Sequence, residues 1–306
     1  MKIFLLKFNW LLLVLFFTVS CLNILAQTTT STPSLNIPAL PKVQIQNPVK
    51  LNSPFLNILA SRLATINLTI ERFCPQDNIL TKRILKDYGA VFVGNGLYSS
   101  PCYFRDDSVA LDVQTRLGIS GNLIGGVRIE LQPAAMAALL KAVADAKRQG
   151  LNITPRGGSI AGRRSFSATL GLWNRNVSAG LIHWVRLGKL TREQANTIPR
   201  MAIMDQVALV LELEDQGIYF STNFDKSILY SVAAPGTSQH NLMLAFDVTQ
   251  FANPRVRQIL ANNGWFQTVA SDLPHFTYLG VQESELPSLG LQSVRVGSQI
   301  FWIPQM

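Results

Sequence analysis

The chain has 306 residues, 48% of them hydrophobic and 15% charged, and a formal net charge of +9 at pH 7. This length accommodates one large domain or two small ones, and the hydrophobic fraction suffices for a core. Three cysteines are too few for a disulfide-dense scaffold or a cysteine-rich zinc module. The positive charge fits an anionic membrane or wall polymer, or simply a basic surface. We expect no nucleic-acid partner, because no motif for one is present.

The first 26 residues have the pattern of an export segment. Lys2 and Lys7 stand before a long apolar run, and no acidic residue is near them, as in a secretory signal peptide. Cleavage after Ala26, lipid attachment at Cys21 and retention as an uncleaved membrane anchor are all open. Each alternative predicts an exported protein of the periplasm or cell envelope, and the last two attach it to the membrane.

Residues 27–54 contain five prolines and no acidic residue, which predicts an extended linker. Residues 55–130 follow as an N-terminal accessory element. It holds Cys74 and Cys102, and an oxidising compartment favours a disulfide between them. Closing a loop of roughly 30 residues stabilises by about 3 kcal/mol in the chain-entropy model. Two buried free thiols are the alternative.

Helix signals dominate the next part of the chain. Pro133 and Gly150 bracket an apolar stripe, which predicts a helix between them. Further helices are expected over residues 167–188, after a capping box formed by Thr191 and Gln194, and over residues 253–264. Residues 151–158 predict a short strand that runs into a loop, and apolar runs predict strands at 227–232 and 242–248. Helices and strands mix without a βαβ rhythm, so we expect an α+β fold.

Two short segments concentrate the residues that could bind a metal. "SQHNLMLAFDV" contains His240 and Asp247, and "SDLPHFTYLG" contains Asp272 and His275. Residues seven apart in one strand point to opposite faces, so His240 and Asp247 can share a ligand only if His240 precedes the strand on a loop that curls back. Two imidazoles and one carboxylate form a zinc site with an open position for water. Asp272 would then be free to act as a base on that water.

These segments resemble the two zinc motifs of the D-Ala-D-Ala metallocarboxypeptidases, the vancomycin-resistance type of D,D-peptidase. That family shares a zinc-binding fold with lysostaphin-type endopeptidases and the hedgehog domain. Its first motif is serine, any residue, histidine and then aspartate seven positions later, which Ser238, His240 and Asp247 match. Its second motif has an acidic residue three positions before a histidine, which Asp272 and His275 match.

The resemblance extends upstream to an arginine-serine pair, matched by Arg164 and Ser165. It implies that Arg164 steadies the substrate carbonyl and that Ser165 and Ser238 bind substrate. The sequence departs from the family at supporting positions. Met243 replaces a glycine, an aspartate replaces the catalytic glutamate, and Pro274 replaces a tryptophan. The ligands are retained, which fits a divergent active enzyme.

The resemblance therefore implies that residues 131–306 form a zinc peptidase domain, with a small antiparallel sheet that carries the site between flanking helices. One Zn²⁺ is expected on His240, Asp247 and His275, with Asp272 as the catalytic base and Arg164 at the oxyanion. The expected reaction is removal of the terminal D-alanine from peptidoglycan stem peptides. A cross-bridge endopeptidase and a non-catalytic wall-binding protein are the alternatives. Nothing in the sequence indicates an oligomeric state.

Overall fold

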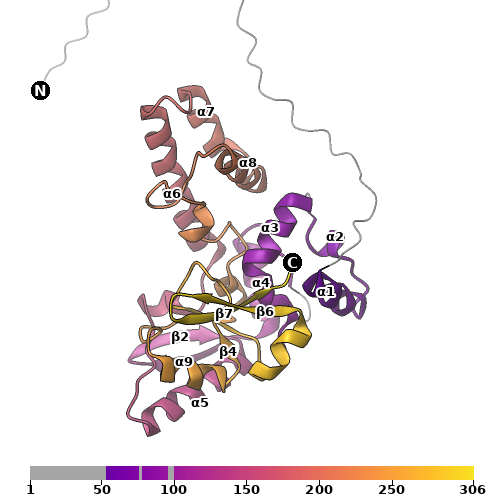
Figure 1. Cartoon of the computed structure of the whole chain (residues 1–306), viewed down its shortest axis with the longest axis vertical. Helices are drawn as coiled ribbons and strands as arrows, with labels where there is room; N and C mark the ends of the chain where they lie inside the picture. The colour runs from indigo at the N-terminus through magenta and orange to yellow at the C-terminus, as the bar shows by residue number, and fades with distance from the viewer. Residues whose placement is uncertain (1–52, 76–77, 96–99) are drawn as a thin grey trace, which may run out of the picture. The chain divides into compact units, whose positions relative to one another are not determined.

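The computed structural model describes residues 53–75, 78–95 and 100–306 (Figure 1). These residues fall in the unit Gln46–Met306. The expected export segment and all but the last two residues of the expected linker lie outside the described residues. Among the described helices, none combines the length and the apolar character needed to cross a bilayer.

Helices and small antiparallel sheets make up the described chain, which confirms the α+β prediction. The α-helices are α1 (Pro54–Ala64), α2 (Ile70–Phe73), α3 (Asn78–Tyr88), α4 (Asp107–Leu117), α5 (Pro133–Arg148), α6 (Phe166–Arg186), α7 (Arg192–Thr197), α8 (Ile203–Asp215) and α9 (Pro254–Ala261). The 3₁₀ helices are η1 (Gly89–Val93), η2 (Gly158–Ala161), η3 (Ile198–Arg200), η4 (Ile228–Tyr230), η5 (Gln239–Leu242) and η6 (Glu283–Leu289). The strands are β1 (Ser120–Ile124), β2 (Val127–Leu131), β3 (Ala245–Asp247), β4 (Trp265–Phe266), β5 (His275–Tyr278), β6 (Leu291–Val296) and β7 (Gln299–Pro304).

The three-stranded sheet has the order β3-β5-β4, with antiparallel neighbours. Its register sets Asp247 directly opposite His275, and Phe246 opposite Phe276. Opposed residues of an antiparallel pair project from the same face, and successive residues alternate between faces. The two phenylalanines, which are buried, therefore point to the face opposite the one that carries Asp247 and His275.

The segment before β2 shares its hydrophobic core with the rest of the described chain. Phe104 donates its backbone N–H to the Gly236 carbonyl, and the Asn95 N–H donates to the Leu279 carbonyl. A disulfide joins Cys74 and Cys102, with 5.0 Å between their Cα atoms. This bond closes the loop that contains α3 and η1.

The helix signals read from the sequence recur in the structure. Pro133 begins α5, and Gly150 follows its end with a φ of 70°. The side chain of Ser165 caps α6 by accepting the Ala168 N–H, and Thr191 caps α7 through a capping box. Asn253 caps α9 and Pro254 is its first residue.

Two expected strands are wrong. Residues 227–232 contain η4 in place of a strand, because the side chains of Ser227 and Glu214 accept the N–H groups of Leu229 and Ile228 that a strand would direct to a neighbour. The short strand expected within 151–158 is reduced to one isolated bridge, Pro155 to Val248, and the expected loop leads into η2. Proline lacks an N–H, and the two glycines that follow have positive φ. The strand expected at 242–248 is shortened to Ala245–Asp247.

Candidate metal centre

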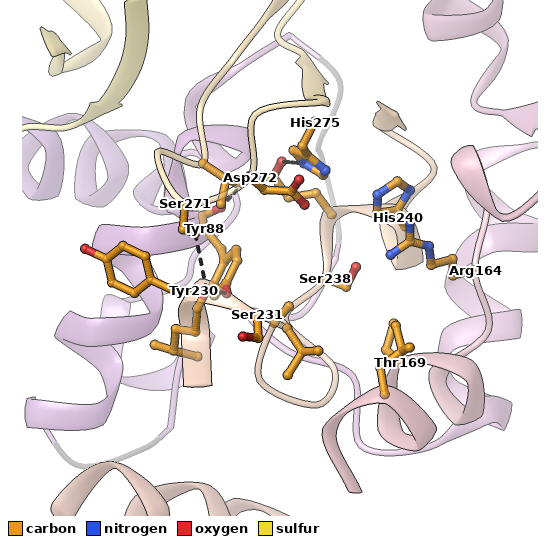
Figure 2. A pocket seen from close by; sticks show the side chains of 16 residues that line it. Tyr88, Arg164, Thr169, Tyr230, Ser231, Ser238, His240, Ser271, Asp272 and His275 are labelled. Atoms are coloured by element: carbon orange, nitrogen blue, oxygen red, sulfur yellow. Dashed lines mark hydrogen bonds between the residues drawn. The ribbon is translucent and has the colours of Figure 1, made fainter. Parts of the chain in front are cut away.

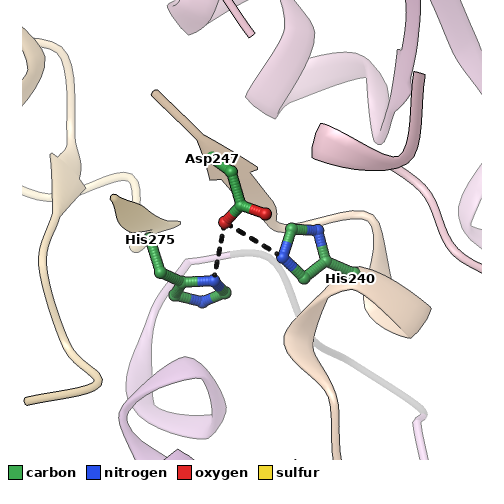
Figure 3. Close-up of side chains that lie close together, drawn as sticks. All are labelled: His240, Asp247 and His275. Atoms are coloured by element: carbon green, nitrogen blue, oxygen red, sulfur yellow. Dashed lines mark hydrogen bonds and ion pairs between the residues drawn. The ribbon is translucent and has the colours of Figure 1, made fainter. Parts of the chain in front are cut away.

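The side chains of His240, Asp247 and His275 converge at one point (Figure 3). One ligand-type atom of each lies within 4.8 Å of the others, and all three residues are buried. Asp247 ends β3 and His275 begins β5, so their opposition follows from the strand register. His240 comes from η5, just before β3. Among the described residues, these three have ligand atoms close enough together to hold a metal ion.

The chain reverses after His240 at Met243. Met243 has a left-handed backbone, with φ 57° and ψ 29°, and donates its N–H to the His240 carbonyl. Its own carbonyl accepts the Gln132 N–H at the start of α5. The left-handed region normally favours glycine, and a larger residue there costs roughly 1–2 kcal/mol. The structure thus gives a reason for a glycine at this position in the family that the motifs resemble.

The hydrogen bond between His240 and the Gly162 carbonyl determines which ring nitrogen of His240 carries the hydrogen. Nδ1 lies 2.7 Å from the Gly162 carbonyl oxygen, which can only accept, so Nδ1 carries the hydrogen. Nε2 lies 3.3 Å from Oδ1 of Asp247, but it is buried and has no hydrogen-bond partner. Burial lowers the pKa of His240 more than the nearby Asp247 raises it. The ring is therefore neutral, with an unshared lone pair toward the carboxylate.

His275 meets the same carboxylate from the other side. Its Nδ1 lies 3.3 Å from Oδ1 of Asp247, and its Nε2 lies 2.9 Å from Oε1 of Gln239. Burial works to raise the pKa of Asp247, but the contacts of its carboxylate with His240 and His275 outweigh burial and hold that pKa well below its ordinary value. Asp247 is therefore ionised.

This donor set fits a metal ion. A single proton can bridge Asp247 to one imidazole at a time, which leaves His240 Nε2 without a partner. A cation between two imidazole nitrogens and a carboxylate oxygen satisfies all three at once. Such a set suits zinc, and three protein ligands leave a coordination position open. Metal-binding histidines usually donate their other ring N–H to a nearby acceptor. The carbonyl of Gly162 serves as this acceptor for His240, and the amide oxygen of Gln239 serves as it for His275.

Arg164 contacts the ligand carboxylate. Its Nη2 lies 2.5 Å from Oδ2 of Asp247, and its Nε donates to the Ile160 carbonyl at 2.8 Å. The sequence resemblance implied a contact with the substrate carbonyl. In the structure the guanidinium contacts Oδ2 of Asp247, whereas the two histidines face Oδ1. Arg164 also lines the neighbouring pocket, and its contact with a substrate carbonyl stays a prediction.

The candidate metal centre opens into a pocket of about 150 Å³ (Figure 2). The pocket is lined by Tyr88, Arg164, Thr169, Leu172, Leu229, Tyr230, Ser231, Val232, Ala233, Ser238, Gln239, His240, Val269, Ser271, Asp272 and His275. Asp272 and His275 both line the pocket, and the carboxylate of Asp272 points into it. Its backbone carbonyl accepts the His275 N–H, so a tight turn links the two residues.

The structure separates the two serines that the resemblance assigned to substrate binding. Ser238 lines the pocket, whereas Ser165 is exposed, caps α6 and is absent from the described lining. Sequence reasoning overlooked Gln239, which occupies the variable position of the first motif. It also overlooked Tyr88, which lies in the N-terminal segment. Every residue from Thr237 to Val248 is buried, and this burial is a property of the fold that the sequence alone does not report for Gln239.

Comparison with known proteins gives little direct support. No family model matches the chain, and a search of curated proteins found no match. A search of solved structures found a crystal structure of a mutant of the vancomycin-resistance D,D-pentapeptidase VanY, from a VanB-type resistance cassette, in complex with Zn(II). The match has 16% identity and a TM-score of 0.32, and it covers 55% of this chain and 82% of that one. A likeness this weak carries no argument about function.

Proposed function

We propose that the chain is a zinc-dependent D,D-carboxypeptidase that acts on peptidoglycan stem peptides. One observation carries the metal assignment: outer hydrogen bonds fix both histidines so that a nitrogen of each faces Asp247, with His240 Nε2 unpartnered. The choice of peptide substrate rests on the resemblance of the motifs around His240 and His275. We further propose that the protein is exported and acts in the cell envelope, where this substrate occurs.

The residues of the chain divide the chemical work. A bound zinc ion would supply Lewis acidity toward water and toward the scissile carbonyl. Asp272, which points into the pocket, accepts a proton from the attacking water and returns one to the leaving amine. Arg164 holds Asp247 in place, so that the carboxylate meets the two histidines without rearrangement.

The polar lining of the pocket suits the end of a peptide chain. The pocket is walled by α6, by the segment around η4 and by the loop before β5. Hydroxyl groups of Ser231, Ser238 and Ser271 lie in that wall and can hydrogen-bond to the end of a peptide. An endopeptidase would instead require a groove that passes a chain on both sides of the scissile bond.

Metal analysis tests the metal assignment. The purified protein is expected to hold about one zinc, and His240→Ala or His275→Ala should lose it, because two remaining ligands bind too weakly. His183→Ala is the matched control. His183 lies in α6, packs against Trp184 and Phe224, and does not line the pocket. Full zinc content in both ligand variants would refute the assignment.

Mass spectrometry of muropeptides tests the substrate. Incubation with isolated stem pentapeptides should release one alanine, and Asp272→Asn should slow that release strongly while retaining zinc. Cut cross-links in intact peptidoglycan would indicate an endopeptidase. No change in either substrate, with zinc bound, would indicate a wall-binding protein.

A further inference from the structure

Gln239 lies between two motif residues, but its side chain serves a distant ligand. It is 1% exposed, and its Oε1 lies 2.9 Å from Nε2 of His275 and 2.5 Å from the hydroxyl of Thr277. Gln239 and His275 are 36 positions apart in the chain. A buried amide that faces a metal-site histidine fixes which ring nitrogen carries the hydrogen.

The orientation of this amide is itself determined. Its NH₂ group lies 3.0 Å from the backbone carbonyl of Tyr88, at the end of α3, and 3.5 Å from the hydroxyl of Thr268. A carbonyl oxygen can only accept a hydrogen bond, so the NH₂ must face Tyr88 and Oε1 must face His275. Oε1 can only accept in turn, so Nε2 of His275 must donate.

Asp247 acts on His275 in the opposite sense. Its Oδ1 lies 3.3 Å from Nδ1, and without a metal it would favour a hydrogen on Nδ1. A ring protonated there cannot offer Nδ1 as a ligand. Gln239 and Asp247 therefore compete for the tautomer of His275, and the amide favours the form that binds metal.

We propose that Gln239 is a positioning residue that selects the Nε2–H tautomer of His275 and thereby keeps Nδ1 available to the metal. This inference deepens the proposed function and rests on it. The segment before β2 takes part through the Tyr88 carbonyl, which lies in the loop that the Cys74–Cys102 disulfide closes. That segment is thus a structural part of the centre.

Nitrogen NMR of the full chain with ¹⁵N-labelled histidine tests the tautomer directly. The sequence has only three histidines, so single His→Ala variants assign each signal. In chelator-treated wild type, at a pH where the rings are neutral, His275 should carry its hydrogen on Nε2. In Gln239→Met, which has a similar shape but no acceptor oxygen, the hydrogen should move to Nδ1. Gln239→Glu retains an acceptor oxygen and should preserve the wild-type tautomer.

Zinc affinity provides the second measurement, by competition between the protein and a chromophoric chelator with Zn²⁺ alone. Gln239→Met should raise the zinc Kd roughly 10–100-fold, the usual effect of losing an outer hydrogen bond at a metal site. Gln206→Met is the matched control: its oxygen accepts from the Trp173 indole and its NH₂ donates to the Ile198 carbonyl, away from the pocket. It should leave the zinc Kd unchanged.

The outcomes separate this inference from the proposed metal centre. A wild type that binds no zinc refutes the metal centre, while the NMR spectra still report on Gln239. An Nδ1–H tautomer in wild type, or an unchanged tautomer in Gln239→Met, overturns the inference. So does a wild-type zinc Kd in Gln239→Met. If Gln239→Met does not fold, the wild-type spectrum and Gln239→Glu decide: a shifted tautomer in Gln239→Glu overturns the inference.

Discussion

If Arg164 holds the ligand carboxylate, the two side chains should be energetically coupled even without metal. Oδ2 of Asp247 lies 2.5 Å from Nη2 of Arg164, and the two side chains are only 10% and 17% exposed. Arg164→Met retains the aliphatic bulk, and Asp247→Asn retains the shape of the carboxylate. Either change leaves a charged partner that is largely shielded from water. The double variant removes both charges together.

The size of the coupling follows from this geometry. Two unit charges whose centres are about 4 Å apart attract by about 4 kcal/mol at an effective dielectric constant of about 20. Breaking a buried pair by removing one partner typically costs about 3–5 kcal/mol. We therefore expect each single variant to lose roughly 3 kcal/mol of unfolding free energy. The double variant should lose little more than either single one, giving a coupling of about 2–3 kcal/mol.

Urea unfolding with a metal chelator present measures this cycle, because zinc would otherwise add its own binding energy. The adjacent Arg163 pairs with Glu130 at 3.0 Å, with side-chain exposures of 28% and 31%, and provides a control cycle. Its coupling should stay below about 1 kcal/mol. Effects of Arg164→Met and Asp247→Asn that add to within about 0.5 kcal/mol would refute the positioning role. Arg164 would then remain a candidate for the substrate carbonyl.

Four further predictions follow from the described contacts. Asp272→Asn should retain zinc but cleave about 10²–10⁴-fold more slowly in a stem-peptide assay, and wild-type rates would exclude Asp272 as the base. Replacing Cys74 and Cys102 by alanine should cost about 3.5 kcal/mol in urea unfolding, since the bond spans 28 residues, and a loss under about 1 kcal/mol would contradict this. Burial raises the pKa of Glu214, so the folded protein binds more protons than the unfolded protein as the pH rises above 4.5. The wild type should therefore lose stability relative to Glu214→Gln as the pH rises, and parallel curves of stability against pH would disprove this. Met243→Gly should be at least as stable as Met243→Ala by thermal unfolding, because glycine relieves the left-handed backbone, whereas at an ordinary buried position glycine would be about 1 kcal/mol worse.

Local signals in the sequence were sufficient for the helices. Pro133, Thr191 and Asn253 act within a few residues of the element that they begin, so their effect can be read from the chain alone. The short strands were harder to predict. Residues 227–232 have the composition of a strand, but a glutamate in α8 accepts one of their N–H groups. Such a contact depends on tertiary structure, which sequence periodicity does not report.

The candidate site divides in the same way. The spacing of His240, Asp247 and His275 pointed to a metal, and the structure brings the three together. The contact between Arg164 and Asp247 links residues 83 positions apart, and no pattern in the chain indicates it. The position of Gln239 at the site could not be predicted from the sequence for a different reason. It stands where the motif tolerates any residue, and the carbonyl that orients its amide lies 151 positions away.

The opposition of Asp247 and His275 restricts how this protein can change in length during evolution. The intervening chain, which includes α9, can gain or lose residues wherever it loops away from the sheet, because the two strands alone hold the ligands face to face. A single insertion within β3 or β5 would turn one ligand toward the buried phenylalanines and abolish the centre. In homologues we therefore expect variable spacing between the two metal motifs, and no insertions or deletions inside them.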